Sequence, residues 1–293
     1  MRKFLALSVE DEQLLLHLHQ HIYLSRDFIE KYIYVRKDAD EKKVKAHELS
    51  VFRRLNQLVK EGYLTKFALP ITPGSGRSSN VYTLARFGVE TVENLTGIVH
   101  WQNKWSYEPQ IWYMHALTLA EVIKSFEVNN NPEVIEVKQF ISEAKGYFEY
   151  YEKEENKIVR HRIRPDGILI IGTPGRDDQN LGIMVEMERS YADKTGTIRK
   201  LNQYNHFFGG VGGPKHDERM KKFDADVGLE HPVLDWRVLF IGNTESMGKR
   251  ILTQLKGQKS EKPILAASKD DLLKNPYGDV YRSLKKPDTL KSL

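Results

Sequence analysis

The feature that most constrains the fold is a long amphipathic segment followed by two short strand-like segments around a glycine-rich loop. Between about residues 43 and 61 the apolar positions recur at helical spacing, at Val51, Leu55, Leu58 and Val59. Gly62 follows directly and is a typical residue at the end of a helix. Residues 63–69 and 80–84 have the composition of strands, and the intervening loop carries a Pro-Gly-Ser-Gly-Arg turn signal. The pattern predicts a helix followed by a two-stranded hairpin.

Two shorter helices are expected before this segment, over residues 10–20 and after a plausible N-cap at Ser25, and a closing helix over residues 86–95. Three helices followed by a hairpin are the order of a winged helix-turn-helix domain, which we place at residues 1–95. The long helix turns outward a polar and basic face that includes Lys43, Ser50, Arg53, Arg54, Gln57 and Lys60, and Arg77 lies at the tip of the predicted wing. Arg and Gln read base edges and Lys contacts phosphates, so the domain is predicted to bind double-stranded DNA.

Composition sets further limits on the whole chain. The 293 residues favour two domains, and the excess of 45 Lys and Arg over 40 Asp and Glu mildly favours a polyanionic partner. The absence of cysteine excludes disulfides, thiolate zinc sites and cysteine nucleophiles. No apolar stretch approaches the length of about 18 residues that indicates a membrane span, so a cytoplasmic protein without a membrane partner is expected.

The second half alternates helical and strand patterns. Helices are expected near residues 112–126, 197–207 and 245–255, with strands at 134–141, 163–171, 181–189 and 236–241. This order predicts an α/β (α+β) domain with a mixed sheet over residues 111–257. Residues 96–110 lack periodicity and are interpreted as a linker, and the lysine-rich residues 258–293 as a basic C-terminal tail.

Acidic residues occupy unusual positions in this domain. Period-two alternation places Glu186 and Glu188 on one face of a largely apolar strand. Burying a carboxylate there costs free energy unless a cation or a hydrogen-bond donor pairs with it. Asp166 begins the preceding strand, and neighbouring strands lie about 4.8 Å apart, so Asp166 and Glu186 are expected to share a site. Such oxygen ligands suit Mg²⁺ or Mn²⁺. In the alternative interpretation these carboxylates pair with Arg164, Arg189 or Lys200 and only stabilise the fold.

The Pro165-Asp166 and Glu186-x-Glu188 motifs, within a helix, three strands, a helix and a strand, resemble the PD-(D/E)xK nuclease fold. With the winged helix in front, residues 8–275 resemble the replication-relaxation family, whose members are linked to replication and relaxation of plasmid and conjugative-element DNA. The resemblance implies that Asp166 and Glu186 bind metal, with Glu188 and Glu121 as further candidate ligands. Glu188 stands where the nuclease lysine is expected, and Lys200 is the candidate substitute from the next helix.

Two functions remain open from the sequence. One is a DNA-binding protein of a plasmid or integrative element that also cuts DNA, with Asp166, Glu186 and Lys200 as catalytic residues and Mg²⁺ or Mn²⁺ as cofactor. The other is a non-enzymatic DNA-binding regulator or scaffold, whose second domain serves dimerisation or recruitment. Candidate partners beyond duplex DNA are other replication or relaxosome proteins and a second copy of the chain.

Overall fold

The computed structural model describes residues 5–35, 41–68, 80–97, 99–110, 113–131, 133–155, 157–188 and 193–293. Contacts between residues divide the chain into two compact units, residues 1–120 and residues 121–293. Each unit is described by itself below.

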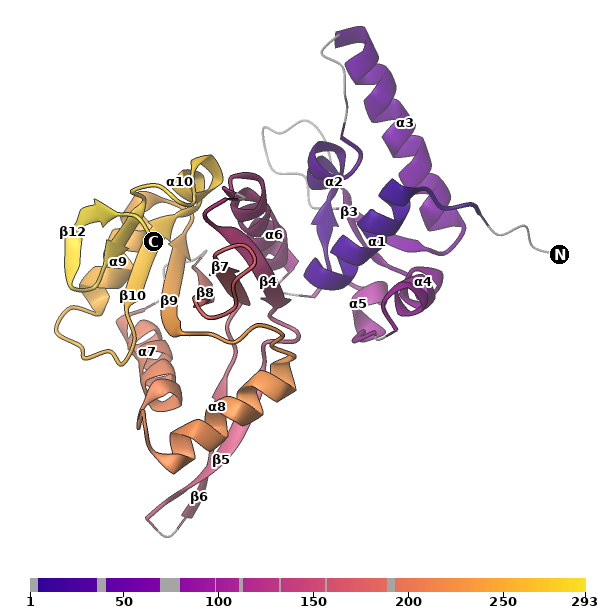
Figure 1. Cartoon of the computed structure of the whole chain (residues 1–293). Helices are drawn as coiled ribbons and strands as arrows, with labels where there is room; N and C mark the ends of the chain where they lie inside the picture. Colours follow the sequence, from indigo (N-terminus) through magenta and orange to yellow (C-terminus); the bar gives the residue numbers. More distant parts are fainter. Residues whose placement is uncertain are drawn as a thin grey trace. The chain divides into compact units, whose positions relative to one another are not determined.

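The first unit is built from helices and a small antiparallel sheet (Figure 1). Its elements are α1 (Val9–His21), β1 (Leu24–Ser25), α2 (Arg26–Tyr32), α3 (Glu41–Lys60), β2 (Leu64–Ala68), β3 (Asn80–Leu84), α4 (Arg86–Thr96) and α5 (Lys104–Tyr107). The sheet has the strand order β1-β3-β2. The predicted order of three helices followed by two paired strands is present. The two-residue strand β1, which pairs with β3, was not predicted because it is too short to show a period.

Local signals fix the boundaries of these helices. The Ser25 side chain accepts a hydrogen bond from the Phe28 amide and caps α2, as predicted. Gly62 follows α3 with a φ of +81°, a left-handed conformation that glycine adopts without strain. The apolar stripe of α3 packs into one core with α1 and α2, which contains Leu14, Leu15, Leu18, Phe28, Ile29, Val51, Leu55 and Leu58.

The second unit centres on a seven-stranded sheet of order β12-β11-β10-β9-β8-β7-β4. The first part of the unit comprises α6 (Tyr113–Val128), which spans the division between the units, β4 (Glu136–Ser142), β7 (Gly167–Gly172), β8 (Leu181–Glu188), α7 (Lys194–Phe208) and β9 (Asp235–Gly242). Strands β4, β7 and β8 are antiparallel neighbours, and β9 runs parallel to β8. This helix–three strands–helix–strand order confirms the fold predicted for the domain.

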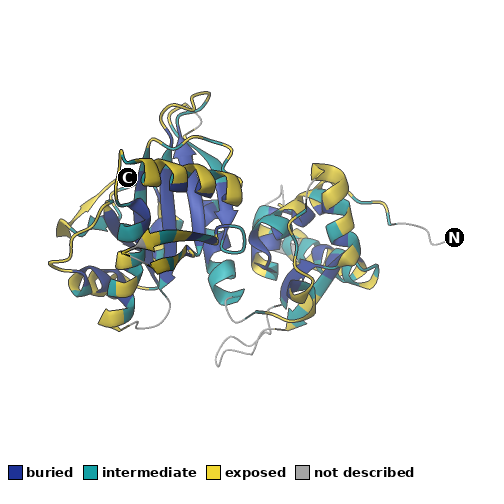
Figure 2. Cartoon of the chain, turned by 90° about the horizontal axis from the view of Figure 1, so that it is seen from below, coloured by how far each residue is buried: buried dark blue, intermediate teal, exposed yellow. Residues whose placement is uncertain are grey.

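Two insertions enlarge that core. A hairpin of β5 (Phe148–Glu154) and β6 (Lys157–Ile163) forms a separate two-stranded sheet, and α8 (Pro214–Val227) follows α7. The face of the sheet that carries Ile168, Met184 and Phe240 packs in one core with residues of α7, α8 and α9 (Glu245–Gln254). Buried strands lie beneath helices whose outer faces are exposed (Figure 2). Within the described ranges, no helix is long and apolar enough to cross a membrane.

The prediction of a basic tail over residues 258–293 is wrong. This segment contains β10 (Ile264–Ser268), α10 (Lys269–Lys274), β11 (Tyr281–Ser283) and β12 (Lys286–Lys291), and all three strands join the sheet. Strand β10 is buried at every residue because it lies between β9 and β11, so its short apolar run shows no alternation. The lysines that suggested a tail lie mostly in the exposed segments between the buried residues.

The interpretation of residues 96–110 as a linker without helical or strand periodicity also differs from the structure. Helix α5 lies within this range, and the Trp105 side chain is buried against Trp101. The Ser106 hydroxyl donates a hydrogen bond of 2.6 Å to the Leu84 carbonyl of β3. The buried Trp105 and the partly buried Trp101 attach this segment to the first unit, because their large apolar rings are removed from water.

Candidate nucleic-acid interface and carboxylate cluster

The exposed face of α3 is the first candidate site. The side chains of Lys43, Ser50, Arg53, Gln57 and Lys60 are all exposed. Their spacings of three, four and seven residues place them on one side of the helix, opposite the buried Val51, Leu55 and Leu58. Residues 43–50 of α3 are exposed or half-buried, and the first half of this helix extends beyond the other helices of its unit (Figure 1). The structure therefore gathers five of the seven predicted DNA-binding residues on one accessible surface.

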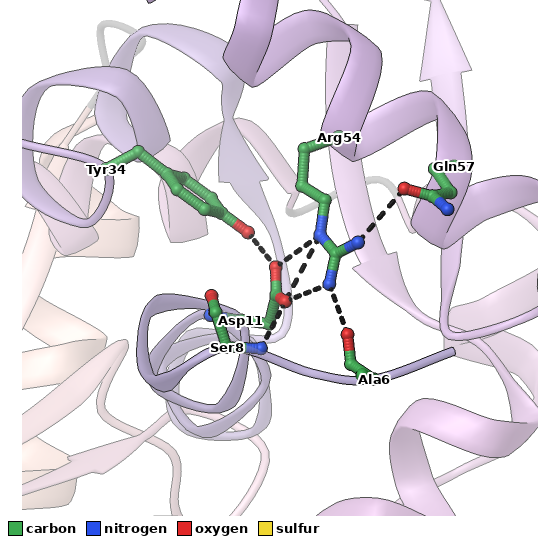
Figure 3. A network of polar contacts seen from close by, with 6 residues as sticks. All are labelled: Ala6, Ser8, Asp11, Tyr34, Arg54 and Gln57. Carbon is green, nitrogen blue, oxygen red and sulfur yellow. Dashed lines mark hydrogen bonds and ion pairs between the residues drawn. The ribbon is translucent and has the colours of Figure 1, made fainter. Parts of the chain in front are cut away.

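Arg54 has a different position from the one predicted (Figure 3). Its guanidinium donates to both carboxylate oxygens of Asp11 on α1, to the Ala6 carbonyl at 2.8 Å and to the Gln57 side chain at 3.0 Å. Asp11 is fully buried. Arg54 therefore joins α3 to α1, and its guanidinium is already occupied. Sequence spacing placed Arg54 beside Arg53 without revealing Asp11, which lies 43 positions away.

Other donors complete the Asp11 network. The Tyr34 hydroxyl donates to Asp11 at 2.5 Å, and the Ser8 amide donates to the same carboxylate at 2.7 Å. Burial raises the pKa of Asp11, but the hydrogen bonds from Arg54 and Tyr34 outweigh burial and hold the pKa below its usual value. Asp11 is therefore a charged residue that fixes α3 against α1. The remaining predicted contact, Arg77, lies outside the described residues.

The second candidate site lies where β7 and β8 face α7. Pairing of Gly167 with Val185 continues to place Asp166 opposite Glu186, and the Asp166 carboxylate accepts a hydrogen bond of 2.6 Å from the Met187 amide. The Glu186 side chain is buried beneath α7. Lys200 Nζ lies 2.6 Å from Glu186 Oε2, and the Tyr204 hydroxyl lies 2.5 Å from Oε1. Lys200 and Tyr204 are one helical turn apart, so both reach the same carboxylate.

Burial dominates the electrostatics of this cluster. It raises the pKa of Glu186 to about 7, although the Lys200 ammonium favours the charged carboxylate. Burial alone would lower the pKa of Lys200, but attraction to the carboxylates of Glu186 and Asp166 raises it above its ordinary value. Burial and the adjacent Glu186 also raise the pKa of Tyr204. Lys200 thus carries a positive charge, and the Tyr204 hydroxyl keeps its proton.

A divalent metal does not fit these residues as they are arranged. Both oxygens of Glu186 accept hydrogen bonds from internal donors, and one oxygen of Asp166 is bound to the backbone. Among the described residues, no three His, Asp or Glu side chains are grouped so that they could hold a metal ion. Glu188 influences Lys200 electrostatically, but neither Glu188 nor Glu121 completes a metal site with Asp166 and Glu186. Arg164, one cation weighed as a partner for these carboxylates, instead pairs with Glu143 at 2.9 Å.

The sequence predicted that Asp166, Glu186 and Lys200 share a site. The hydrogen bond from Tyr204 to Glu186 was not predicted. The position of Tyr204 four residues after Lys200 was the available signal, because this spacing places two side chains on one helical face. The basic strand β6, in which Arg160 and Arg162 alternate with His161 and Ile163, was not predicted either. Two-residue spacing of arginines was the signal there, since it places them on one side of a strand.

Comparisons with known proteins gave structural matches of low similarity and a family match. A solved structure of the restriction endonuclease FokI matches with 13% sequence identity and a TM-score of 0.29, covering 89% of this chain and 43% of that one. The structure of FokI bound to DNA matches with 12% identity, a TM-score of 0.27 and the same coverage. This chain thus spans less than half the length of either match. No curated protein matches this chain.

The family comparison covers more of the chain. The model of the replication-relaxation family matches residues 15–220, which include α3, the Asp166–Glu186 pair and α7. This range is well over half of the 293 residues. The chain therefore belongs to the replication-relaxation family.

Proposed function

We propose that this chain is a DNA-binding protein that acts in replication, relaxation or transfer of a plasmid or an integrative or conjugative element. In this proposal, the first unit binds double-stranded DNA through the exposed face of α3. The observation that carries the proposal is the arrangement of Lys43, Ser50, Arg53, Gln57 and Lys60 on one accessible helical surface.

The dimensions and chemistry of this surface suit duplex DNA. Lys43 and Lys60 are separated by roughly 26 Å along the helix axis, from a rise of about 1.5 Å per residue. A major groove about 12 Å wide admits an α-helix, and the face carries Arg and Gln between terminal lysines. Arg53 is exposed and forms no ion pair with the residues that the structure describes. Its guanidinium can therefore contact a base edge or a phosphate without first breaking an internal bond.

Titration of a labelled duplex with the full chain, read as fluorescence anisotropy, tests this proposal. Arg53→Ala should weaken binding about 5- to 150-fold, the range for losing a two-pronged contact to a base. Arg86→Ala is the matched control, because Arg86 is an exposed arginine on α4 and its loss changes the net charge equally. Equal affinities for the two variants would show that α3 is not the DNA-binding surface.

For the second unit we propose that it binds DNA without cleaving it. The juxtaposition of Asp166, Glu186 and Lys200 is the observation that favours cleavage, but internal hydrogen bonds occupy both oxygens of Glu186. A bound metal would compete with Lys200 and Tyr204 for the lone pairs of Glu186, and the loss of either hydrogen bond is costly in a buried site.

Two measurements test for metal-dependent cleavage. Supercoiled plasmid incubated with the full chain and Mg²⁺ or Mn²⁺ should stay intact, and calorimetry with either ion should give no saturable heat. Nicking that disappears in the Glu186→Ala variant would contradict this part of the proposal and establish a metal-dependent nuclease.

A further inference from the structure

A polar cleft lies between the β5–β6 hairpin and α7 in the second unit. It has a volume of about 340 Å³ and is lined by Tyr150, Arg160, His161, Arg162, Gln203 and His206. Ligand pockets commonly start at about 300 Å³, so the cleft is large enough for a group bigger than a phosphate ion. None of its lining residues belongs to the carboxylate cluster.

The charge of the lining is positive. No carboxylate lines the cleft, whereas Arg160 and Arg162 of β6 both line it. Arg160 pairs with Glu149, which holds its guanidinium in place. Arg162 is exposed and forms no ion pair or hydrogen bond with any described residue. Two arginines therefore border the cleft, one braced by an ion pair and one unpaired among the described residues, and guanidinium groups suit a phosphate.

The remaining wall consists of stacked rings. The imidazoles of His161 and His206 lie 3.7 Å apart with an angle of 14° between their planes, and Tyr150 stacks on His161. The Tyr150 hydroxyl is 2.7 Å from His206 Nδ1, so a hydrogen bond fixes these rings. The buried Arg219 lies over the Tyr150 ring and is bound to the Phe207 and Gly209 carbonyls. These contacts hold the rings as a rigid wall, against which an aromatic base can pack edge to face.

Gln203 connects the cleft to the carboxylate cluster. Gln203 and Arg162 also line a smaller cavity of about 70 Å³ that includes Lys200 and Glu186. The Gln203 amide forms no hydrogen bond with another described residue, so it can donate and accept on the polar edge of a base. Lys200 at the far end supplies a further positive charge along the same helix.

We propose that this cleft binds one nucleotide of a single DNA strand, with its phosphate at Arg160 and Arg162 and its unpaired base at Gln203 and the ring wall. A base in duplex DNA must first be unpaired and unstacked to enter such a cleft, whereas a base in a single strand does not bear that cost. The proposal rests on the proposed DNA-binding function and deepens it. The first unit would hold the duplex while the second unit holds an unwound strand.

Binding of labelled oligothymidylate to the full chain tests this inference. Arg162→Ala should weaken binding about tenfold. It should also lower the steepness of the plot of log affinity against log salt concentration by about 0.7, as expected for one lost phosphate contact. Gln203→Ala should weaken binding without changing that slope. Arg176→Ala is the matched control, because Arg176 is exposed and lies at the opposite end of β7 and β8.

The duplex probe separates the two proposals. Arg162→Ala should leave duplex binding and the thermal unfolding midpoint unchanged, whereas Arg53→Ala should weaken duplex binding only. Equal single-strand affinities for Arg162→Ala and Arg176→Ala would overturn the inference. Loss of single-strand binding in Arg53→Ala instead would assign the strand to the first unit and also overturn it. Neither result would alter the duplex proposal, which fails only if Arg53→Ala binds duplex like the wild type.

Discussion

Arg53 and Arg54 are adjacent on α3, and the structure assigns them opposite roles. Arg53 is exposed and unpaired among the described residues, whereas Arg54 is bound to the buried carboxylate of Asp11. Replacing each arginine with alanine removes the same charge from neighbouring positions. We expect Arg53→Ala to affect DNA binding alone and Arg54→Ala to destabilise the first unit.

The size of the Arg54 effect follows from its contacts. Removing one partner of a buried ion pair costs about 3–5 kcal/mol. The Arg54 side chain is 24% exposed, and Asp11 keeps hydrogen bonds from Tyr34 and Ser8, so the lower end of that range applies. A loss of about 3 kcal/mol should lower the unfolding midpoint of this unit by on the order of 10 °C. Replacing both Asp11 and Arg54 with alanine should cost less than the sum of the two single replacements.

Thermal unfolding followed by circular dichroism measures these midpoints, and hydrogen exchange shows whether the loss is confined to α1 and α3. Arg53→Ala is the matched control and should unfold within about 1 °C of the wild type, since isolated surface substitutions change stability by less than about 0.5 kcal/mol. Equal midpoints for the two variants would refute the structural role of the Asp11–Arg54 pair.

Further predictions concern the second unit. Burial raises the pKa of Glu186 from 4.5 to about 7, so the folded chain holds this proton more tightly than the unfolded chain. The free energy of unfolding should therefore fall as the pH rises from about 4.5 to 7, and Glu186→Gln should flatten that slope in urea titrations; parallel slopes would contradict the assignment. Gly182→Ala places a methyl group 2.4 Å from the Trp236 ring and should cost about 1–3 kcal/mol in the same assay. Gly248→Ala, whose added methyl meets nothing closer than 3.7 Å, is its control, and equal stabilities would refute the packing argument. Truncation after residue 257 removes β10 and should abolish cooperative unfolding of this unit; a truncated chain with unchanged unfolding would restore the interpretation of a tail.

Sequence periodicity predicted the elements that have one solvated face. The stripe of α3 and the alternation in β8 each identify a buried side, and pairing across β7 and β8 then brings Asp166 to Glu186. Strand β10 was not predicted, because it is buried on both faces and its short apolar run shows no alternation with polar residues.

The candidate site was predictable only where its residues share an element or lie on neighbouring strands. The contact of Arg54 with Asp11 joins residues far apart in the chain, and no local pattern reveals which of two adjacent arginines finds a buried partner. Whether a metal fits the carboxylate cluster depends on the hydrogen-bond donors that surround Glu186. Lys200 was expected near this residue, but the hydrogen bond from Tyr204 depends on how α7 packs on the sheet.

The central claim is that α3 contacts duplex DNA, and the absence of cysteine from the chain allows a direct test. A single cysteine at the exposed Ser50 of α3 can carry an iron chelate that cleaves nearby DNA through hydroxyl radicals. The same chelate on a cysteine at the exposed Asn94 of α4 is the control. We expect Ser50→Cys to cleave bound duplex strongly and Asn94→Cys to cleave it weakly. Equal cleavage from both positions, or none from Ser50→Cys while the duplex stays bound, would contradict the account.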